Sequence, residues 1–152
     1  MISFLKKKAK IGLDVQGFVR VLEKGELVYR DWEEKFDILP LVDFLKTDLK
    51  EAEILTSTSD PLEASKTLAK WGAKEVLITR KEGVSVYVDG EYYEAPFNPS
   101  KIVGRTGRGD TCMASYIGKR LEDNPKKALE FAAKITSKKL EIDGPFNERL
   151  EF

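Results

Sequence analysis

The strongest constraint on the fold is a glycine-rich run, Val103 to Ala114, that leads into an amphipathic pattern. A glycine turn before a helix points backbone N–H groups at the helix N-terminus, where the helix dipole favours negative charge. Asp110 follows the last glycine of the run, in a suitable place to take a proton from a hydroxyl that attacks a phosphate. The run therefore indicates a phosphoryl-transfer site with Asp110 as the base.

The run fits neither of two common phosphate-binding motifs. The Gly-Lys-Ser/Thr ending of a Walker loop is absent, and Cys112 stands where the dinucleotide motif has its third glycine. Arg108-Gly109-Asp110 also spells an integrin-type tripeptide, but that function needs an exposed extracellular loop and nothing in the sequence supports secretion. The plain alternative is a glycine turn with Asp110 as the N-cap of the next helix. On the residues alone, the catalytic site and the cap both stay open.

Composition excludes several classes of function. The 152 residues fit one α/β domain over 1–152. Lys plus Arg and Asp plus Glu both number 26, so no basic field favours nucleic acid. With no histidine and Cys112 as the only cysteine, a zinc site, a histidine-dependent catalytic pair and a disulfide framework are not expected. Neither a signal peptide nor a membrane span is visible, so we expect a cytoplasmic protein without membrane partners.

Apolar runs and turn residues predict alternating strands and helices. A Pro at the first helical position and an Asx residue before it mark two helix starts, and Asp48 and Glu51 have the spacing of a capping box at a third. Strands are predicted at 11–15, 75–79, 84–88 and 91–95, a small hairpin at 21–30, and helices from 48, 61, 110 and 125. This order predicts a layered α/β fold with a partly parallel sheet.

Finer features are also predicted. Residues 16–20 are expected to break the first strand, and residues 140–152 to form a tail that contains Gly144-Pro145. Helical spacing after the glycine run predicts an inward face of Met113, Tyr116, Ile117 and Leu121.

The segment Gly104 to Thr111 resembles the Asp-Thr-Thr-Gly-Ala-Gly-Asp-Thr signature of the ribokinase-like, PfkB carbohydrate kinases. This resemblance implies a ribokinase-like (Rossmann-like) layered fold. It implies that Asp110 deprotonates the substrate hydroxyl and that the amides of Gly107, Arg108 and Gly109 form an anion hole. It also implies ATP with Mg²⁺ as the donor and a hydroxyl of a sugar or polyol, such as inositol, as the acceptor.

Further segments resemble the family in the expected order. Thr79, Arg80 and Gly83 resemble its Thr-x-Gly-x-x-Gly nucleotide-binding turn, although the spacing is one residue short and the first glycine is absent. Asp48 and Glu51 resemble its Asn-x-x-Glu region, which implies that Asp48 contacts the nucleotide and Glu51 influences Mg²⁺ indirectly. The segment 13–20 looks like the strand and loop that open the second half of several members.

Two departures from the signature carry information. Gly104 replaces the first Asp, whose carboxylate helps to hold a monovalent cation in ribokinase, so K⁺ activation is not expected. Arg108 replaces the usual Ala, and a guanidinium there is a candidate phosphate contact. The position of Arg105, at the phosphate or in solvent, stays open.

The resemblance spans nearly the whole chain but only the C-terminal half of a typical family member. The lid and most sugar contacts belong to the other half. A sheet cut in two leaves an open edge at 11–15, so we expect a homo-oligomer or association with a missing N-terminal half. Two alternatives from other classes are an incomplete nucleotide-binding module and a structural interaction domain whose glycine turn is only a cap.

Overall fold

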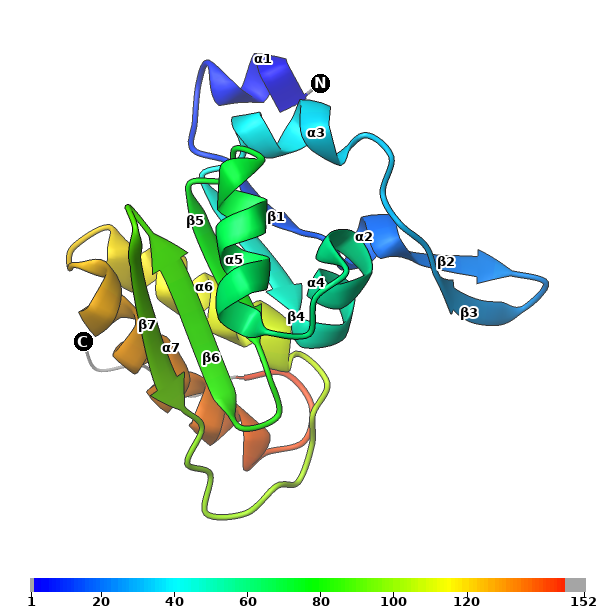
Figure 1. Cartoon of the computed structure of the whole chain (residues 1–152). Coiled ribbons are helices and arrows are strands. Elements are labelled where there is room, and N and C mark those ends of the chain that lie inside the picture. Colours follow the sequence, from blue (N-terminus) through cyan, green and yellow to red (C-terminus); the bar gives the residue numbers. More distant parts are fainter. Residues whose placement is uncertain (1, 147–152) are drawn as a thin grey trace.

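A mixed five-stranded sheet forms the centre of the computed structural model, which describes residues 2–146 (Figure 1). The strand order is β1-β4-β5-β6-β7, with β1, β4 and β5 parallel and β6 and β7 antiparallel. The strands are β1 (Gly12–Asp14), β4 (Phe44–Asp48), β5 (Glu75–Thr79), β6 (Gly83–Val88) and β7 (Glu91–Pro96). The predicted α/β fold with a partly parallel sheet is confirmed.

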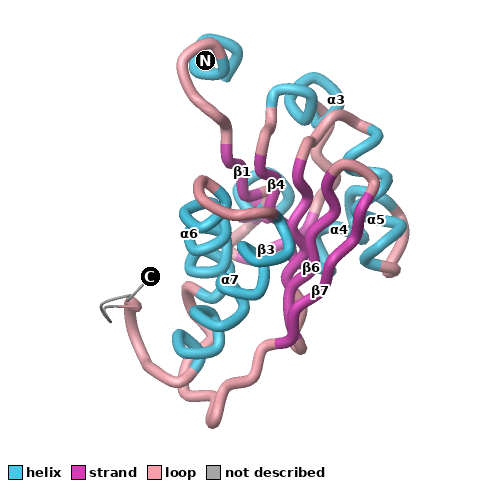
Figure 2. The backbone as a smooth tube through the Cα atoms, turned by 90° about the vertical axis from the view of Figure 1, so that its left-hand side faces the viewer, coloured by secondary structure: helices cyan, strands magenta, loops and turns pink. Residues whose placement is uncertain are grey.

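Helices cover both faces of this sheet (Figure 2). α4 (Leu49–Thr56) and α5 (Pro61–Lys70) pack on one face, and α6 (Arg108–Arg120) and α7 (Pro125–Leu140) on the other. Successive side chains of a strand point to opposite faces, so Leu45 joins the core under α4 and α5 while Phe44 joins the core under α6 and α7. Because helices cover both faces, β4 and β5 are buried along almost their whole length.

Local turn chemistry sets the starts of three helices. The predicted capping box at α4 is present: Glu51 N donates to Asp48 Oδ1 at 2.8 Å, and Asp48 N donates to Glu51 Oε2 at 2.8 Å. α5 begins at Pro61 after the Asp60 cap, and α7 begins at Pro125 after the Asn124 cap. The capping box fixes the chain at the carboxyl end of β4, where the candidate site lies.

A hairpin of β2 (Arg20–Glu23) and β3 (Glu26–Tyr29) forms its own two-stranded sheet and projects from the body of the molecule (Figure 1). Leu22 and Leu27 face each other across it and are 74% and 58% exposed. The remaining short elements are α1 (Ile2–Lys6), α2 (Gln16–Val19), α3 (Lys35–Ile38) and η1 (Leu39–Leu41).

Three details differ from the sequence-based expectations or lie beyond them. Residues 16–20 do not simply break the first strand, because 16–19 form the helical turn α2 that leads into the hairpin. Leu121 does not face inward: α6 ends at Arg120 and Leu121 is 70% exposed, whereas Tyr116 is buried. Residues 147–152 of the predicted tail lie outside the described residues. Within 2–146, no helix combines the length and apolar character needed to cross a bilayer.

Candidate active site

A cavity of about 370 Å³ lies where the carboxyl ends of β1, β4 and β5 meet the N-terminus of α6. This is the edge at which open α/β sheets bind ligands. The lining residues are Gln16, Arg20, Lys46, Asp48, Thr79 and 105–110. The fold therefore brings together most of the sequence-predicted site: Asp48, Thr79 and all of 107–110.

α6 begins earlier than a cap at Asp110 would require. Gly107 is the N-cap residue, with φ of +77°, a left-handed conformation that glycine adopts without strain. Its carbonyl accepts from Thr111 N at 2.9 Å, and no side chain caps the helix. Asp110 is therefore the third residue of the helix, and the alternative in which it is the N-cap is wrong. Its carboxylate is free of that role and borders the cavity.

The amides of this first turn differ in how they are bonded. Arg108 N donates to Arg105 O at 3.2 Å. The N–H groups of Gly109 and Asp110 lie in the first turn of α6, where the helix offers them no carbonyl partner. Neither donates to another acceptor within residues 2–146. These two N–H groups are thus available to an anion in the cavity. Asp110 N was not part of the predicted anion hole.

Lys46 brings a buried positive charge to the same turn. Its side chain is almost fully buried, and its Nζ lies 2.8 Å from Asp14 Oδ2 at the end of β1. A Cβ added to Gly109 would lie 2.6 Å from this Nζ, so only glycine allows the ammonium to approach α6 so closely. An anion bound at the Gly109 amide would meet both the helix dipole and the Lys46 charge.

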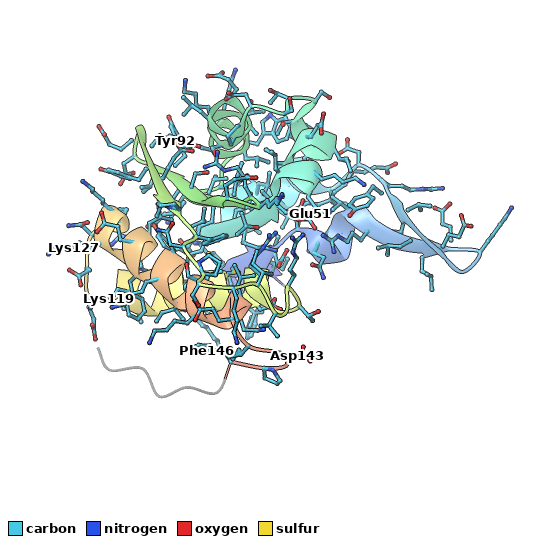
Figure 3. The ribbon with its side chains drawn as sticks, turned by 90° about the horizontal axis from the view of Figure 1, so that it is seen from below. Glu51, Tyr92, Lys119, Lys127, Asp143 and Phe146 are labelled. Atoms are coloured by element: carbon cyan, nitrogen blue, oxygen red, sulfur yellow. The ribbon has the colours of Figure 1, made fainter. Side chains whose placement is uncertain are left out.

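Arg20, the first residue of β2, joins the hairpin to the start of α4. Its Nη2 lies 2.8 Å from Asp48 Oδ2 and 2.8 Å from Glu51 Oε1. Glu51 is fully buried close to the base of the hairpin (Figure 3). Burial raises the pKa of Glu51 and the nearby Asp48 charge adds to this, although the Asp48 amide, Lys46 and Arg20 act in the opposite direction.

Two further cations in the cavity have no ionic partner. Arg105 and Arg108 both line it, and neither forms an ion pair with any residue in the described part of the chain. Together with Arg20 and Lys46 they give the cavity an excess of positive charge. This charge suits a phosphorylated ligand.

The predicted nucleotide-binding turn is only partly at the cavity. Thr79 lines it, and its Oγ1 donates to Thr47 O at 3.4 Å. Arg80 is instead ion-paired with Glu94 of β7, and neither Arg80 nor Gly83 is among the lining residues. Glu51 also lies behind the lining rather than in it.

The carboxylates around the cavity fit indirect rather than direct binding of Mg²⁺. Residues 2–146 contain no group of three or more acidic, cysteine or histidine side chains able to enclose a metal. Asp48 and Glu51 are held by Arg20, although Glu51 Oε1 has no hydrogen bond. Mg²⁺ commonly keeps several waters and binds through substrate phosphates with one or two carboxylates. Of these two carboxylates, Asp48 borders the cavity and could face such an ion, whereas Glu51 lies behind the lining.

Sequence reasoning missed Lys46 and the role of Arg20. The signal for Lys46 was a lysine directly after the apolar pair Phe44 and Leu45, two residues before the Asp48 cap. Arg20 lay in a segment already noted for its resemblance, but its partners are 28 and 31 residues away. No local pattern reveals such long-range pairs.

An open α/β sheet whose carboxyl edge meets a glycine-rich helix start beside an aspartate is what the resemblance to ribokinase-like kinases implied. In agreement, the model of the pfkB family of carbohydrate kinases matches residues 25–145. The chain belongs to this family.

The similar proteins include kinases with different substrates. A cytidine kinase of Thermococcus kodakarensis is 35% identical over 111 residues, which cover 67% of this chain and 40% of that protein. A pyrophosphate-dependent kinase of the ribokinase family, solved with a pyrophosphate analogue and myo-inositol, is 44% identical with a TM-score of 0.91 over 96% of this chain and 54% of that one. A ribokinase II-like protein of E. coli, solved with ATP and Mg²⁺, is 27% identical with a TM-score of 0.64 over 72% and 36%. The chain thus spans about half the length of these relatives or less.

Proposed function

We propose that this chain carries the phosphoryl-transfer centre of a kinase that phosphorylates a hydroxyl of a polyol such as inositol. The observation that carries this proposal is the shared cavity of the Asp110 carboxylate, the open amides at the start of α6 and the unpaired Arg105 and Arg108. A base, an anion hole and positive charge are the parts that phosphoryl transfer needs.

In the proposed step, a phosphoryl group moves from the donor to the acceptor hydroxyl. Asp110 accepts the proton of the acceptor hydroxyl, and the oxygen of that hydroxyl bonds to the transferred phosphorus. The bond from this phosphorus to the leaving phosphate breaks, and the leaving group takes the bonding electrons. The first-turn amides and the Lys46 ammonium stabilise the charge that develops on the phosphate oxygens. Mg²⁺ held by the donor phosphates would neutralise part of the same charge.

Two donors suit this site, ATP and inorganic pyrophosphate. ATP is the donor that the family resemblance implies, and the E. coli relative was solved with it. Pyrophosphate is the second candidate, because among residues 2–146 no aromatic side chain lines the cavity to stack a base while four cations do line it. The pyrophosphate-dependent relative also matches 96% of this chain. The acceptor proposal has the same support, since that relative was solved with myo-inositol.

A phosphate-binding module without turnover is the alternative. The chain resembles the C-terminal, nucleotide-side half of the family, and about half of each relative's length has no counterpart in it. In that half of the relatives we expect the lid and most of the acceptor pocket.

The substitution Asp110→Asn helps to distinguish a kinase from a phosphate-binding module without turnover. With ATP or pyrophosphate and Mg²⁺ over a panel of polyols, we expect wild-type turnover to fall by several orders of magnitude in the variant, because the amide cannot accept the proton. Donor binding measured by calorimetry should change little. Binding without turnover in the wild type, alone and with a supplied N-terminal half, would select the module. Equal turnover of variant and wild type would remove Asp110 from the role of base.

A further inference from the structure

Lys139, in the last turn of α7, is a buried cation without a carboxylate partner. The residue is 2% exposed, and it forms no ion pair within residues 2–146. Its Nζ donates one long hydrogen bond, 3.4 Å, to Ile142 O. Taking an ammonium out of water costs more than one weak carbonyl contact and the dipole at the end of a helix can return. Within residues 2–146, the charge therefore lacks the partner that would compensate its burial.

The surroundings of Lys139 indicate that its charge would favour an anion bound at the start of α6. Its Cε lies 3.6 Å from the position of a Cβ on Gly107, the N-cap of α6. It also lines a second cavity, of about 670 Å³, whose wall includes Thr106, Gly107 and Asp110. These three residues also line the phosphate cavity. The turn 106–110 thus lies between Lys46 on one side and Lys139 on the other.

The junction next to this turn does not fit a monovalent metal ion. Gly104 has no carboxylate to offer, and the carbonyl of Ile142 lies 3.1 Å from the position of its absent Cβ. That carbonyl already accepts from Lys139. Asp143, whose Oδ1 lies beside Gly104, accepts from Gly144 N. Figure 3 shows Asp143 and Phe146 in the segment that follows α7.

We propose that Lys139 is a positioning residue for the phosphate site: its ammonium is a fixed positive charge behind the turn 107–109 that increases affinity for the phosphoryl donor and removes any need for a monovalent cation. This inference rests on the proposed function. The ammonium acts on the anion through the turn and also holds the carbonyl of Ile142, so it keeps the segment after α7 against the glycine loop. Gly104 N and Val103 N, which both donate to Leu140 O, complete this contact.

The test measures binding of pyrophosphate by calorimetry to the full chain and to three variants. Lys139→Met removes the charge and keeps a long side chain, Lys139→Arg keeps the charge, and Lys126→Met removes an exposed charge from the other end of α7 as a matched control. Each protein is measured in potassium chloride and in tetramethylammonium chloride, and its melting temperature is recorded without ligand.

We expect wild type, Lys126→Met and Lys139→Arg to bind within about threefold of one another in both salts, and Lys139→Met to bind at least about 10-fold more weakly. The melting temperature of free Lys139→Met should equal or exceed that of wild type, because an unpaired buried charge has been removed. A purely structural lysine would give the opposite change in melting temperature.

Other outcomes overturn the inference. Binding by Lys139→Met within twofold of wild type contradicts it, and so does a lower melting temperature that accounts for the loss of binding. If Lys139→Met fails to fold, the salt comparison on the wild type decides, because a strong dependence of affinity on K⁺ contradicts a built-in cation. Absence of pyrophosphate and ATP binding by the wild type would instead overturn the proposed function, and the inference with it.

Discussion

Gly109, in the first turn of α6, has only a hydrogen atom on the side where the ammonium of Lys46 lies. The added Cβ of an alanine would lie 2.6 Å from Nζ and 2.8 Å from Cε, so the lysine side chain would have to move. The displaced atoms form the end of a flexible chain, so the move costs little stability. It does take the charge away from the open amides.

Gly109→Ala should therefore lower pyrophosphate affinity by about 10-fold while changing the free energy of unfolding by no more than about 1 kcal/mol. The affinity losses of Gly109→Ala and Lys46→Met should not add in the double variant, because both remove the same contact. Calorimetry with pyrophosphate and urea unfolding measure the two quantities. Additive losses would mean that the glycine and the lysine act independently.

Whether the role of a residue could be predicted from the sequence depended on how far along the chain its partners lie. Asp48 and Glu51 lie one helical turn apart, and the capping box that they form was visible in the sequence. Lys46 reaches Asp14 and Gly109 only after the sheet has formed, so the sequence indicated no role for it. Asp110 was placed in the right element but could also have been its cap, because only the conformation of Gly107 shows where α6 starts.

Among the elements, α1 and the residue that precedes β1 are both bound by one carboxylate, Asp43, just before β4. Its Oδ2 accepts from Ile11 N at 2.8 Å and from Lys6, and its Oδ1 lies 3.0 Å from Lys74 Nζ. Burial alone would raise its pKa, but hydrogen bonds from Lys6, Ile11 N and Lys74 outweigh this and hold the pKa at about 2. Its usual value is 3.8.

The depressed pKa of Asp43 predicts a stability change in acid. Ionised Asp43 stabilises the fold fully above its unfolded pKa, and this contribution of about 2 kcal/mol disappears as the pH falls through the folded pKa. The difference in unfolding free energy between wild type and Asp43→Asn should shrink as the pH falls from about 6 to about 2. Urea unfolding over this range measures it. A difference that stays constant with pH would show that the carboxylate charge is not what stabilises α1 and β1.

Helix and strand order was predictable because the signals are local: Asx-Pro starts, an Asp-Gly turn and period-two alternation. The misplaced features lie where tertiary contacts decide. The segment 16–19 forms α2 and is followed by Arg20, which pairs with the distant Asp48, and Leu121 is exposed because α6 has already ended.

At the scale of the whole molecule, the outer edge of β1 and the apolar pair of the hairpin are among the features that have no partner within residues 2–146. β1 is hydrogen-bonded to a strand only on its β4 side, and the projecting hairpin exposes the Leu22–Leu27 pair. Isolated two-stranded hairpins have little stability of their own in water, and open edges invite pairing. We therefore predict that the chain self-associates at micromolar concentration unless a polypeptide corresponding to the other half of its relatives is supplied.

Sedimentation velocity tests this association. Leu22→Lys with Leu27→Lys should shift the wild-type oligomer toward monomer, because two charges replace the exposed apolar pair. Leu121→Lys, which changes an equally exposed leucine at the far end of α6, is the matched control and should not. A wild type that sediments as a monomer throughout the micromolar range would contradict the prediction.

The hairpin has one more consequence, which concerns communication between surfaces. Arg20 is both the first residue of β2 and the side chain that pairs with Asp48 and Glu51 beside the cavity of the candidate active site. A molecule that binds Leu22 and Leu27 therefore contacts the hairpin whose first residue, Arg20, pairs with Asp48 and Glu51. If binding at the hairpin changes the affinity for the phosphoryl donor by some factor, thermodynamic reciprocity requires the donor to change the affinity at the hairpin by the same factor. The degree of association would then depend on whether the phosphoryl donor is bound.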